Sequence, residues 1–358
     1  MIGLTAALAP ARAEAPAAPL AMTLRAPVLD ADAVPYLNAA GRADYQRFVQ
    51  QATPRAFAVA PDGSWGWASA LETQAATDAR ALEICNRWTG GSSTGSGGNG
   101  AGGGACKLYA RNLDVVWPGR ESTASVASET ALESGPGWSL VPDARFFWQG
   151  PQRARGVYVW AHGRAAGGQD SRGSQPQPHV RVFNNAGYDV LRFDRAPETD
   201  ETDTAAAWLH SALKALRAMG YQRVVVGGQS RGGWNALQAL DQPGLVDAVV
   251  AIAPAAHGPT GSPAWAWALD DLKRIIAAAR NPAARVVIAN FARDEFDPDP
   301  EGRARIFRSL QAPQVHSTLF LDRPAGLEGH GGGADARFTL RYGACLLAFT
   351  EGRTDRCG

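Results

Sequence analysis

One segment, Arg223–Leu240, constrains the fold of this chain more than any other. It begins with Val224–Val226, a β-branched run that is typical of a buried parallel strand. The pattern Gly-x-Ser-x-Gly follows at Gly228–Gly232, and the apolar residues of Trp234–Leu240 then recur at helical spacing. The segment therefore predicts a strand that turns sharply into a helix, with Ser230 exposed at the apex. The flanking glycines allow such a turn because they have no Cβ atom to clash.

The pattern Gly-x-Ser-x-Gly occurs a second time at Gly91–Gly95, with Ser93 in its centre. No strand signal precedes this copy and no helix signal follows it, and it lies in a run of Gly and Ser that is typical of a flexible linker. The pattern by itself is therefore a weak signal. We take Ser230, and not Ser93, as the candidate nucleophile because only Ser230 has the strand and the helix around it.

From about Arg155 onward, strand signals and helix signals alternate regularly, as they do in a doubly wound α/β sheet. Residues 118–150 hold Trp138 and Phe146–Trp148 in an alternating context, and we expect them to supply the first antiparallel strands of the same sheet. Strands are expected at residues 157–161, 188–193, 224–226, 246–252, 285–290 and 317–321, and helices at 204–219, 265–279, 301–310 and 335–349.

The turn at Ser230 and the alternation around it resemble the α/β-hydrolase superfamily, in its serine-esterase and dienelactone-hydrolase-like branch. The likeness extends over about 220 residues, and it implies a mostly parallel sheet flanked by helices. In that family the serine of the Gly-x-Ser-x-Gly turn is the nucleophile, and the acid and the histidine follow it in chain order. A serine hydroxyl needs such a base within hydrogen-bond reach, and the base needs an acid to orient it.

The resemblance implies His330 as the base. His330 lies in the glycine-rich stretch Gly329–Gly333, between the last expected strand and the last expected helix, which is where this family places its histidine. The glycines would let its ring approach Ser230 closely. His257 is the second candidate, because it follows the strand after Ser230, although it precedes every suitable acid.

Asp294 is the acid that the resemblance implies. It follows the end of the expected strand 285–290 by four residues, where the family places an aspartate. Its role would be to hold the tautomer of His330 and to stabilise the imidazolium. Asp297 is the next candidate in the same acidic loop.

An oxyanion hole needs two backbone N–H groups that point at the developing negative charge. In this family one comes from the residue after the nucleophile, here Arg231. The other comes from the loop after an early strand, where His162–Arg164 resembles the family motif, so the amide of Arg164 is the candidate. Substrate choice is assigned to the segments 164–178 and 258–269. Candidate substrate-binding residues are His162, Gln229, Trp234, Trp265 and Trp267, and for the last two a place in a helix core is equally favoured.

Residues 31–118 predict a separate small α+β unit. A helix is expected at 41–49, two strands around a Pro-Asp-Gly turn within 55–67, a short helix at 77–84 and a closing hairpin at 106–117. The unit resembles a cysteine-bearing module of secreted proteobacterial proteins. It contains no histidine and no clustered carboxylates, so we expect a structural or adhesive role. The predicted organisation is therefore a leader and linker at 1–30, this unit, and a hydrolase domain at 119–358.

The four cysteines indicate an oxidising compartment. Pairing Cys85 with Cys106 and Cys345 with Cys357 would close two local loops, and the spacing does not fit a zinc site. Four unpaired buried thiols are the alternative. The apolar start of the chain contains Ala-x-Ala triplets typical of signal-peptide cleavage, although the usual basic residues are missing. Both features favour a periplasmic or secreted protein, and an Ala/Pro-rich tail is the alternative reading of the start.

The composition gives no reason to expect nucleic acid or a membrane as partner. The net charge is +1, and no run of 18 apolar residues occurs. We expect no metal and no cofactor, because the histidines lack ligand spacing and there is no phosphate loop. The sequence thus predicts a serine hydrolase that cleaves a small-molecule or polymeric carboxylic ester. Dienelactone-hydrolase-like or peptidase activity on the same residues, and a non-catalytic envelope protein, are the alternatives.

Overall fold

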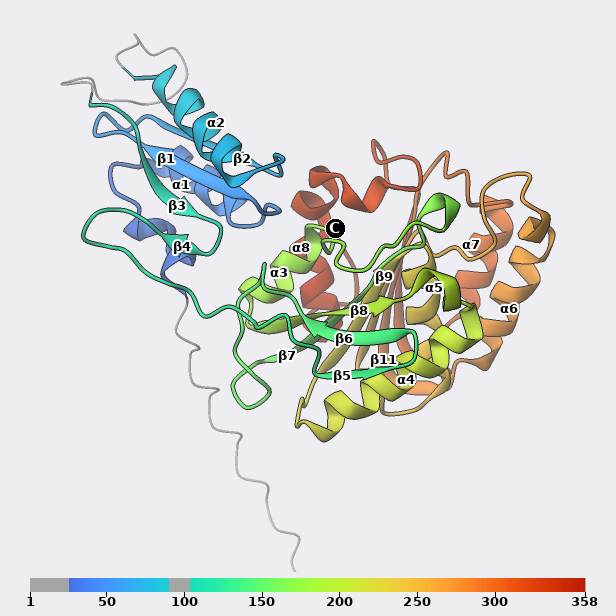
Figure 1. Ribbon diagram of the computed structural model, residues 1–358. Helices are drawn as coiled ribbons and strands as arrows, with labels where there is room; N and C mark the ends of the chain where they lie inside the picture. Colours follow the sequence, from blue (N-terminus) through green and yellow to red (C-terminus); the bar gives the residue numbers. More distant parts are fainter. Residues whose placement is uncertain (1–25, 90–103, 358) are drawn as a thin grey trace, which may run out of the picture.

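A computed structural model describes residues 26–89 and 104–357 of the chain. The predicted leader and the Gly/Ser-rich run around Ser93 lie outside the described residues, so the expectations for them stay predictions. The described chain forms two β-sheets with separate helices, a small sheet from its first part and a large sheet from the remainder (Figure 1).

The small sheet is antiparallel and has helices on both faces. Alternate residues of its central strand face opposite cores: Phe57 and Val59 pack with side chains of the first helix, and Ala56 and Ala58 pack with side chains of the second. The structure confirms every element predicted here, and the second helix is longer than expected. The strands, in the order β2-β1-β3-β4, are β1 (Arg55–Val59), β2 (Trp65–Ser69), β3 (Lys107–Arg111) and β4 (Asp114–Val115), and the helices are α1 (Ala39–Phe48) and α2 (Gln74–Asn86).

The large sheet has eight strands in the order β12-β11-β10-β9-β7-β8-β6-β5. The six strands from β12 to β8 are parallel, and β6 and β5 are antiparallel at the edge, as predicted. Phe146–Trp148, also expected in a strand, lies outside the sheet, with only an isolated bridge from Phe147 to Val126. The strands are β5 (Glu133–Gly135), β6 (Trp138–Pro142), β7 (Gly156–Ala161), β8 (Tyr188–Arg195), β9 (Val224–Gln229), β10 (Ala248–Ile252), β11 (Asn281–Asn290) and β12 (Val315–Asp322).

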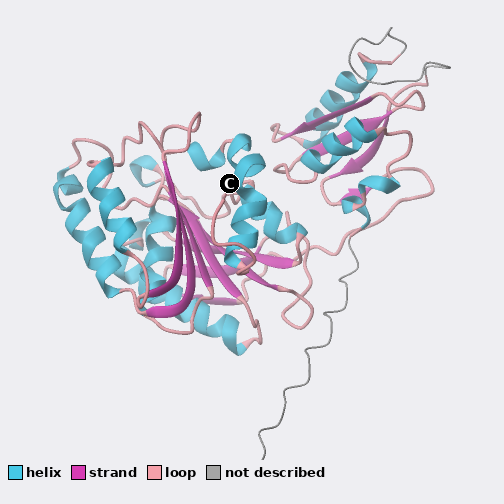
Figure 2. Ribbon diagram, turned by 180° about the vertical axis from the view of Figure 1, so that it is seen from behind, coloured by secondary structure: helices cyan, strands magenta, loops and turns pink. Residues whose placement is uncertain are grey.

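Helices cover both faces of this sheet, which is why the central strands β7 and β10 are buried along their whole length (Figure 2). Val157 and Val159 of β7 pack in the core under four helices, whereas Tyr158 and Trp160 pack in the core under the other two. The first group is α4 (Thr202–Ala218), α5 (Arg231–Gln238), α6 (Ala268–Ala278) and α7 (Pro300–Ser309), and the second is α3 (His179–Asn185) and α8 (Ala336–Thr350). The predicted α/β architecture is therefore present, with α3 as the helix that the sequence did not predict.

Contacts among the described residues join the parts that carry the two sheets, and one is a hydrogen bond from the side-chain amide of Asn185 to the carbonyl of Val49. The side-chain amide of Asn184 on α3 bonds both backbone groups of Phe147, and the Phe147 ring packs in the core of the small sheet. Gln175 exchanges hydrogen bonds with Thr53. The two sheets share no described strand, and we propose a boundary near residue 118, after β4 ends.

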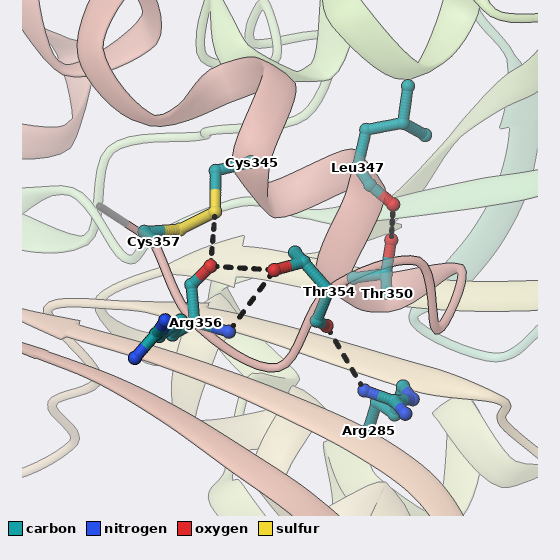
Figure 3. Close-up of a disulfide and its surroundings, with 7 residues drawn as sticks. All are labelled: Arg285, Cys345, Leu347, Thr350, Thr354, Arg356 and Cys357. Atoms are coloured by element: carbon teal, nitrogen blue, oxygen red, sulfur yellow. Dashed lines mark hydrogen bonds between the residues drawn. A yellow bond between two sulfur atoms is a disulfide. The ribbon is translucent and has the colours of Figure 1, made fainter.

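Both predicted cysteine pairs are disulfides. Cys85 at the end of α2 is bonded to Cys106 just before β3, and Cys345 on α8 is bonded to Cys357. Figure 3 shows how the second bond ties the C-terminal tail back onto α8, beside a hydrogen bond from the Arg285 side chain to the carbonyl of Thr354. Within residues 26–89 and 104–357, no helix combines the length and the apolar character needed to span a membrane.

Candidate active site

Ser230 lies between β9 and α5 with a backbone conformation that an L-residue rarely adopts. Its φ is 55° and its ψ is −123°. The surrounding backbone holds it there: the N–H of Ser230 donates to the carbonyl of Ile252 at 3.0 Å, and its carbonyl accepts from the N–H of Ala255 at 3.1 Å. The predicted sharp turn is confirmed, and strain of this kind persists only where the neighbouring structure imposes it.

The two glycines that flank this turn are required by packing as well as by the turn itself. A Cβ atom on Gly232 would lie 1.8 Å from the carbonyl oxygen of Ala161, and one on Gly228 would lie 2.4 Å from the same oxygen. Any side chain at either position would therefore push α5 away from β7. The Gly-x-Ser-x-Gly pattern is thus a packing constraint between the helix, the turn and the neighbouring strand.

His330 and Asp294 form a hydrogen-bonded pair beyond the ends of β12 and β11. The Nδ1 atom of His330 lies 2.9 Å from Oδ1 and 3.0 Å from Oδ2 of Asp294. The carboxylate can only accept, so Nδ1–H is the donor and the neutral ring carries its lone pair on Nε2. The second candidate acid, Asp297, lies instead beside the buried guanidinium of Arg303, with 3.6 Å between Oδ1 and Nε.

Two further contacts hold His330 in place. Phe296 stacks against it with 4.1 Å between the ring centroids, and the side-chain amide of Gln229 donates to the carbonyl of His330 at 3.1 Å. Because Gln229 precedes Ser230, this hydrogen bond brings the His330 loop next to the turn. Its Nε2 is buried and has no hydrogen-bond partner among the described residues, which leaves the proton-accepting atom free.

Ser230 opens onto a cavity of about 440 Å³. Three loops at the carboxyl ends of strands form its wall, as is usual for open α/β sheets. The predicted oxyanion donors Arg164 and Arg231 both line it. The lining residues are Arg164, Ala165, Gly167, Gly168, Ser230, Arg231, Ala255, Ala256, His257, Gly258, Pro259 and Phe296.

The loop after β7 lies directly beside the turn. A Cβ atom on Gly163 would lie 3.4 Å from the Cβ of Ser230, so Arg164, the next residue, is adjacent to the nucleophile. His162 holds this loop from behind: its Nδ1 lies 2.6 Å from the carbonyl of Gly163, and its Nε2 accepts the N–H of Arg195 at 3.0 Å. Burial, helped by the charge of Arg195, lowers the pKa of His162 to about 4, so the ring stays neutral and positions the loop.

None of the five residues suggested for substrate binding appears among the described residues that line the cavity. His162 and Gln229 support the loops, and Trp234 is buried in the core with its ring against His257. Trp265 and Trp267, for which the cavity wall and a helix core were equally favoured, are likewise absent from this lining. They lie in a short 3₁₀ helix, η6 (Pro263–Trp267), that contains no buried residue, and Trp267 is 62% exposed.

The structure also adds residues that the sequence did not suggest. Phe296 forms part of the cavity wall and stacks on His330, and no sequence signal distinguished it from other loop residues. His257, the second candidate base, lines the cavity but is bonded through Nε2 to Asp271 on α6 at 2.7 Å. The sequence predicted the position of His257 after the strand β10, but it did not predict Asp271 as its partner.

Comparison with known proteins identifies the fold of the larger part of the chain. Residues 159–306 match the family model of the alpha/beta hydrolase fold. The chain therefore has the α/β-hydrolase fold. No curated protein matches its sequence.

Solved structures of other α/β-hydrolases resemble part of this chain at low sequence identity. The esterase Pf2001 of Pyrococcus furiosus is 15% identical, with 63% of this chain and 93% of that chain covered and a TM-score of 0.44. A puromycin hydrolase is 17% identical, with 67% and 42% covered and a TM-score of 0.47. A putative dienelactone hydrolase from Klebsiella pneumoniae is 15% identical, with 64% and 99% covered and a TM-score of 0.42.

Proposed function

We propose that this α/β-hydrolase cleaves carboxylic esters through an acyl-enzyme, with Ser230 as nucleophile, His330 as base and Asp294 as the orienting acid. The observation that carries the proposal is the combination of a strained serine at the end of β9 with a histidine whose Nδ1 is held by a carboxylate and whose Nε2 is unpaired. A structural serine and a structural histidine need neither feature.

In the proposed reaction the Oγ of Ser230 attacks the ester carbonyl while Nε2 of His330 takes its proton. The negative charge that develops on the carbonyl oxygen would be bound by the backbone N–H groups of Arg231 and Arg164. His330 then returns the proton to the departing alcohol, and the acyl group stays on Ser230. Water attacks the acyl-enzyme with the same histidine as base, which releases the acid and restores the serine. Asp294 stabilises the imidazolium in both steps.

We further propose that the protein works outside the cytoplasm, in the periplasm or as a secreted protein. The two disulfides support this, because such bonds persist in oxidising compartments and are rare in the cytosol. Fractionation of cells that express the full chain, followed by thiol labelling, would test it. Labelling of all four cysteines without prior reduction would contradict the proposal.

The test of the chemistry uses a fluorophosphonate probe and 4-nitrophenyl acetate on the full chain. Ser230→Ala should abolish labelling and lower kcat by at least about a thousandfold, because the covalent route is lost. Ser211→Ala is the matched control: this serine lies exposed on α4, with its hydroxyl bonded to the carbonyl of Ala207. If Ser230→Ala kept full turnover, the assignment of the nucleophile would be wrong.

A further inference from the structure

The cavity beside Ser230 is lined by basic side chains and by no acidic side chain among its described lining residues. The ionisable side chains among its described lining residues are Arg164, Arg231 and His257, and none of those lining residues is Asp or Glu. Its other wall residues are mostly small and apolar, with Ala255, Pro259 and Phe296 among them. A cavity lined by one sign of charge attracts ligands of the opposite sign.

The two arginines of this wall differ in how their charges are satisfied. Arg231 is buried and donates to the carbonyls of Asp200, at 2.9 Å, and Ala256, at 3.2 Å. Burial lowers the pKa of the Arg231 guanidinium, Asp200 opposes this shift, and the positive charge of Arg164 adds to it. Two side chains of the same charge therefore line one cavity.

Arg164 has no ion pair and no side-chain hydrogen bond with any described residue, although it stands exposed at the cavity. Arg172, eight residues further on, shows the contrast: its guanidinium binds the carboxylate of Asp170 with an N–O distance of 2.6 Å. Because Arg164 and Arg231 line the same cavity, the unpaired guanidinium of Arg164 is available to an anion that is bound there beside Ser230.

We propose that the ester substrate carries a carboxylate, and that the guanidinium of Arg164 binds this carboxylate while Ser230 attacks the ester carbonyl. A guanidinium can bind a carboxylate with two parallel hydrogen bonds, which orients the ligand as well as holding it. The apolar part of the wall then contacts the carbon chain between the two groups. A half ester of a short dicarboxylic acid has this chemistry. The inference rests on the proposed ester hydrolysis and adds the substrate class to it.

The kinetic test compares 4-nitrophenyl hydrogen adipate with 4-nitrophenyl hexanoate, which share a six-carbon acyl chain and differ in the terminal carboxylate. The readout is the ratio of kcat/KM for the anionic ester to kcat/KM for the neutral one. Arg164→Gln should lower this ratio about tenfold, as expected for the loss of a charge-assisted hydrogen bond at a partly exposed site. The backbone amide of residue 164 is kept, so any effect on the oxyanion acts on both esters and cancels in the ratio.

Arg172→Gln is the matched control, because it removes the same charge from the same loop while its guanidinium is already paired. It should leave the ratio unchanged. On the unmodified protein, raising the salt concentration from about 0.05 to 0.5 M should lower the ratio several-fold, because salt screens the exposed charge of Arg164. An unchanged ratio in Arg164→Gln, or an equal fall in Arg172→Gln, would overturn the inference.

A binding measurement separates this inference from the proposed function. Monomethyl adipate, an anion, and dimethyl adipate, its neutral counterpart, are titrated calorimetrically into Ser230→Ala, which cannot acylate. The anion should bind more tightly, and adding Arg164→Gln should remove the difference. If neither nitrophenyl ester is hydrolysed by the unmodified protein, the proposed ester hydrolysis fails, and this titration still decides the inference: equal binding of the two adipates contradicts it.

Discussion

The strained backbone of Ser230 makes a measurable prediction about stability. At φ 55° and ψ −123°, a residue with a Cβ atom is strained by roughly 1–3 kcal/mol, whereas glycine enters this region freely. Ser230→Gly removes the strain but adds conformational freedom to the unfolded chain, which costs roughly 0.5–1 kcal/mol. The net expectation is a gain of about 1 kcal/mol in the free energy of unfolding.

Ser230→Ala is the control, because it removes the same hydroxyl and keeps the Cβ atom and its strain. No described residue forms a hydrogen bond with the Ser230 hydroxyl, so neither variant breaks one. Both variants should lose turnover of 4-nitrophenyl acetate. Only Ser230→Gly should unfold at a higher temperature than Ser230→Ala, by about 2 °C for a protein of this size.

Differential scanning calorimetry on the full chain, with both variants at the same pH and scan rate, gives this difference. Circular dichroism should show that both variants keep the native helix and strand content. A Ser230→Gly protein that unfolds at or below the temperature of Ser230→Ala would refute the reasoning, since the backbone at residue 230 would then store no strain.

Three further expectations concern the same region. Burial lowers the pKa of His162 to about 4 and that of His179 to about 3, from 6.5. The unfolded state therefore takes up more protons than the folded state as the pH falls below 6.5. Urea titrations should give an unfolding free energy about 4 kcal/mol lower at pH 5 than at pH 7. Gly232→Ala should destabilise the fold by roughly 3 kcal/mol or more in urea unfolding, because its Cβ would overlap the Ala161 carbonyl, whereas Gly331→Ala, with open space around its Cβ, should not. Asp294→Asn should lower kcat by roughly 10³–10⁴-fold, because His330 loses the group that selects its tautomer; a loss below tenfold would contradict that role.

The order of strands and helices was predictable because apolar residues recur with a different period in strands and in helices. Val224–Val226 and the β-branched runs beside it can be buried only in a sheet with two covered faces, and the helix 204–219 shows one apolar side. Chain order then placed Asp294 and His330 in loops at the same edge as Ser230, and their hydrogen bond follows from that placement. Local sequence patterns, together with the chain order of the catalytic residues in the family, were therefore sufficient to predict the sheet and the three residues.

Other features depend on contacts that no local pattern encodes. The apolar spacing at Trp265 and Trp267 fits a core helix, but the chain forms a short 3₁₀ helix there that contains no buried residue. The sequence placed His162 near the site, but its neutral state arises mainly from burial. Its supporting role depends on the backbone N–H of Arg195, which is 33 residues away in sequence. The sequence likewise could not show that Arg164 is unpaired, because this depends on where the acidic side chains lie in the folded chain.

The geometry also explains how the fold tolerates strain at Ser230. Strand β9 lies between β7 and β10. On the β10 side, the carbonyl of Ile252 accepts the N–H of Ser230, and the N–H of Ala255 after β10 donates to the carbonyl of Ser230. On the other side, the carbonyl of Ala161 at the end of β7 lies where a Cβ of Gly232 would be. Because these contacts come from central strands buried on both faces, the turn can relax only if the sheet itself separates. The residue proposed to act as nucleophile is therefore held by strands buried on both faces, whereas the residue proposed to choose the substrate, Arg164, lies exposed on the loop after β7.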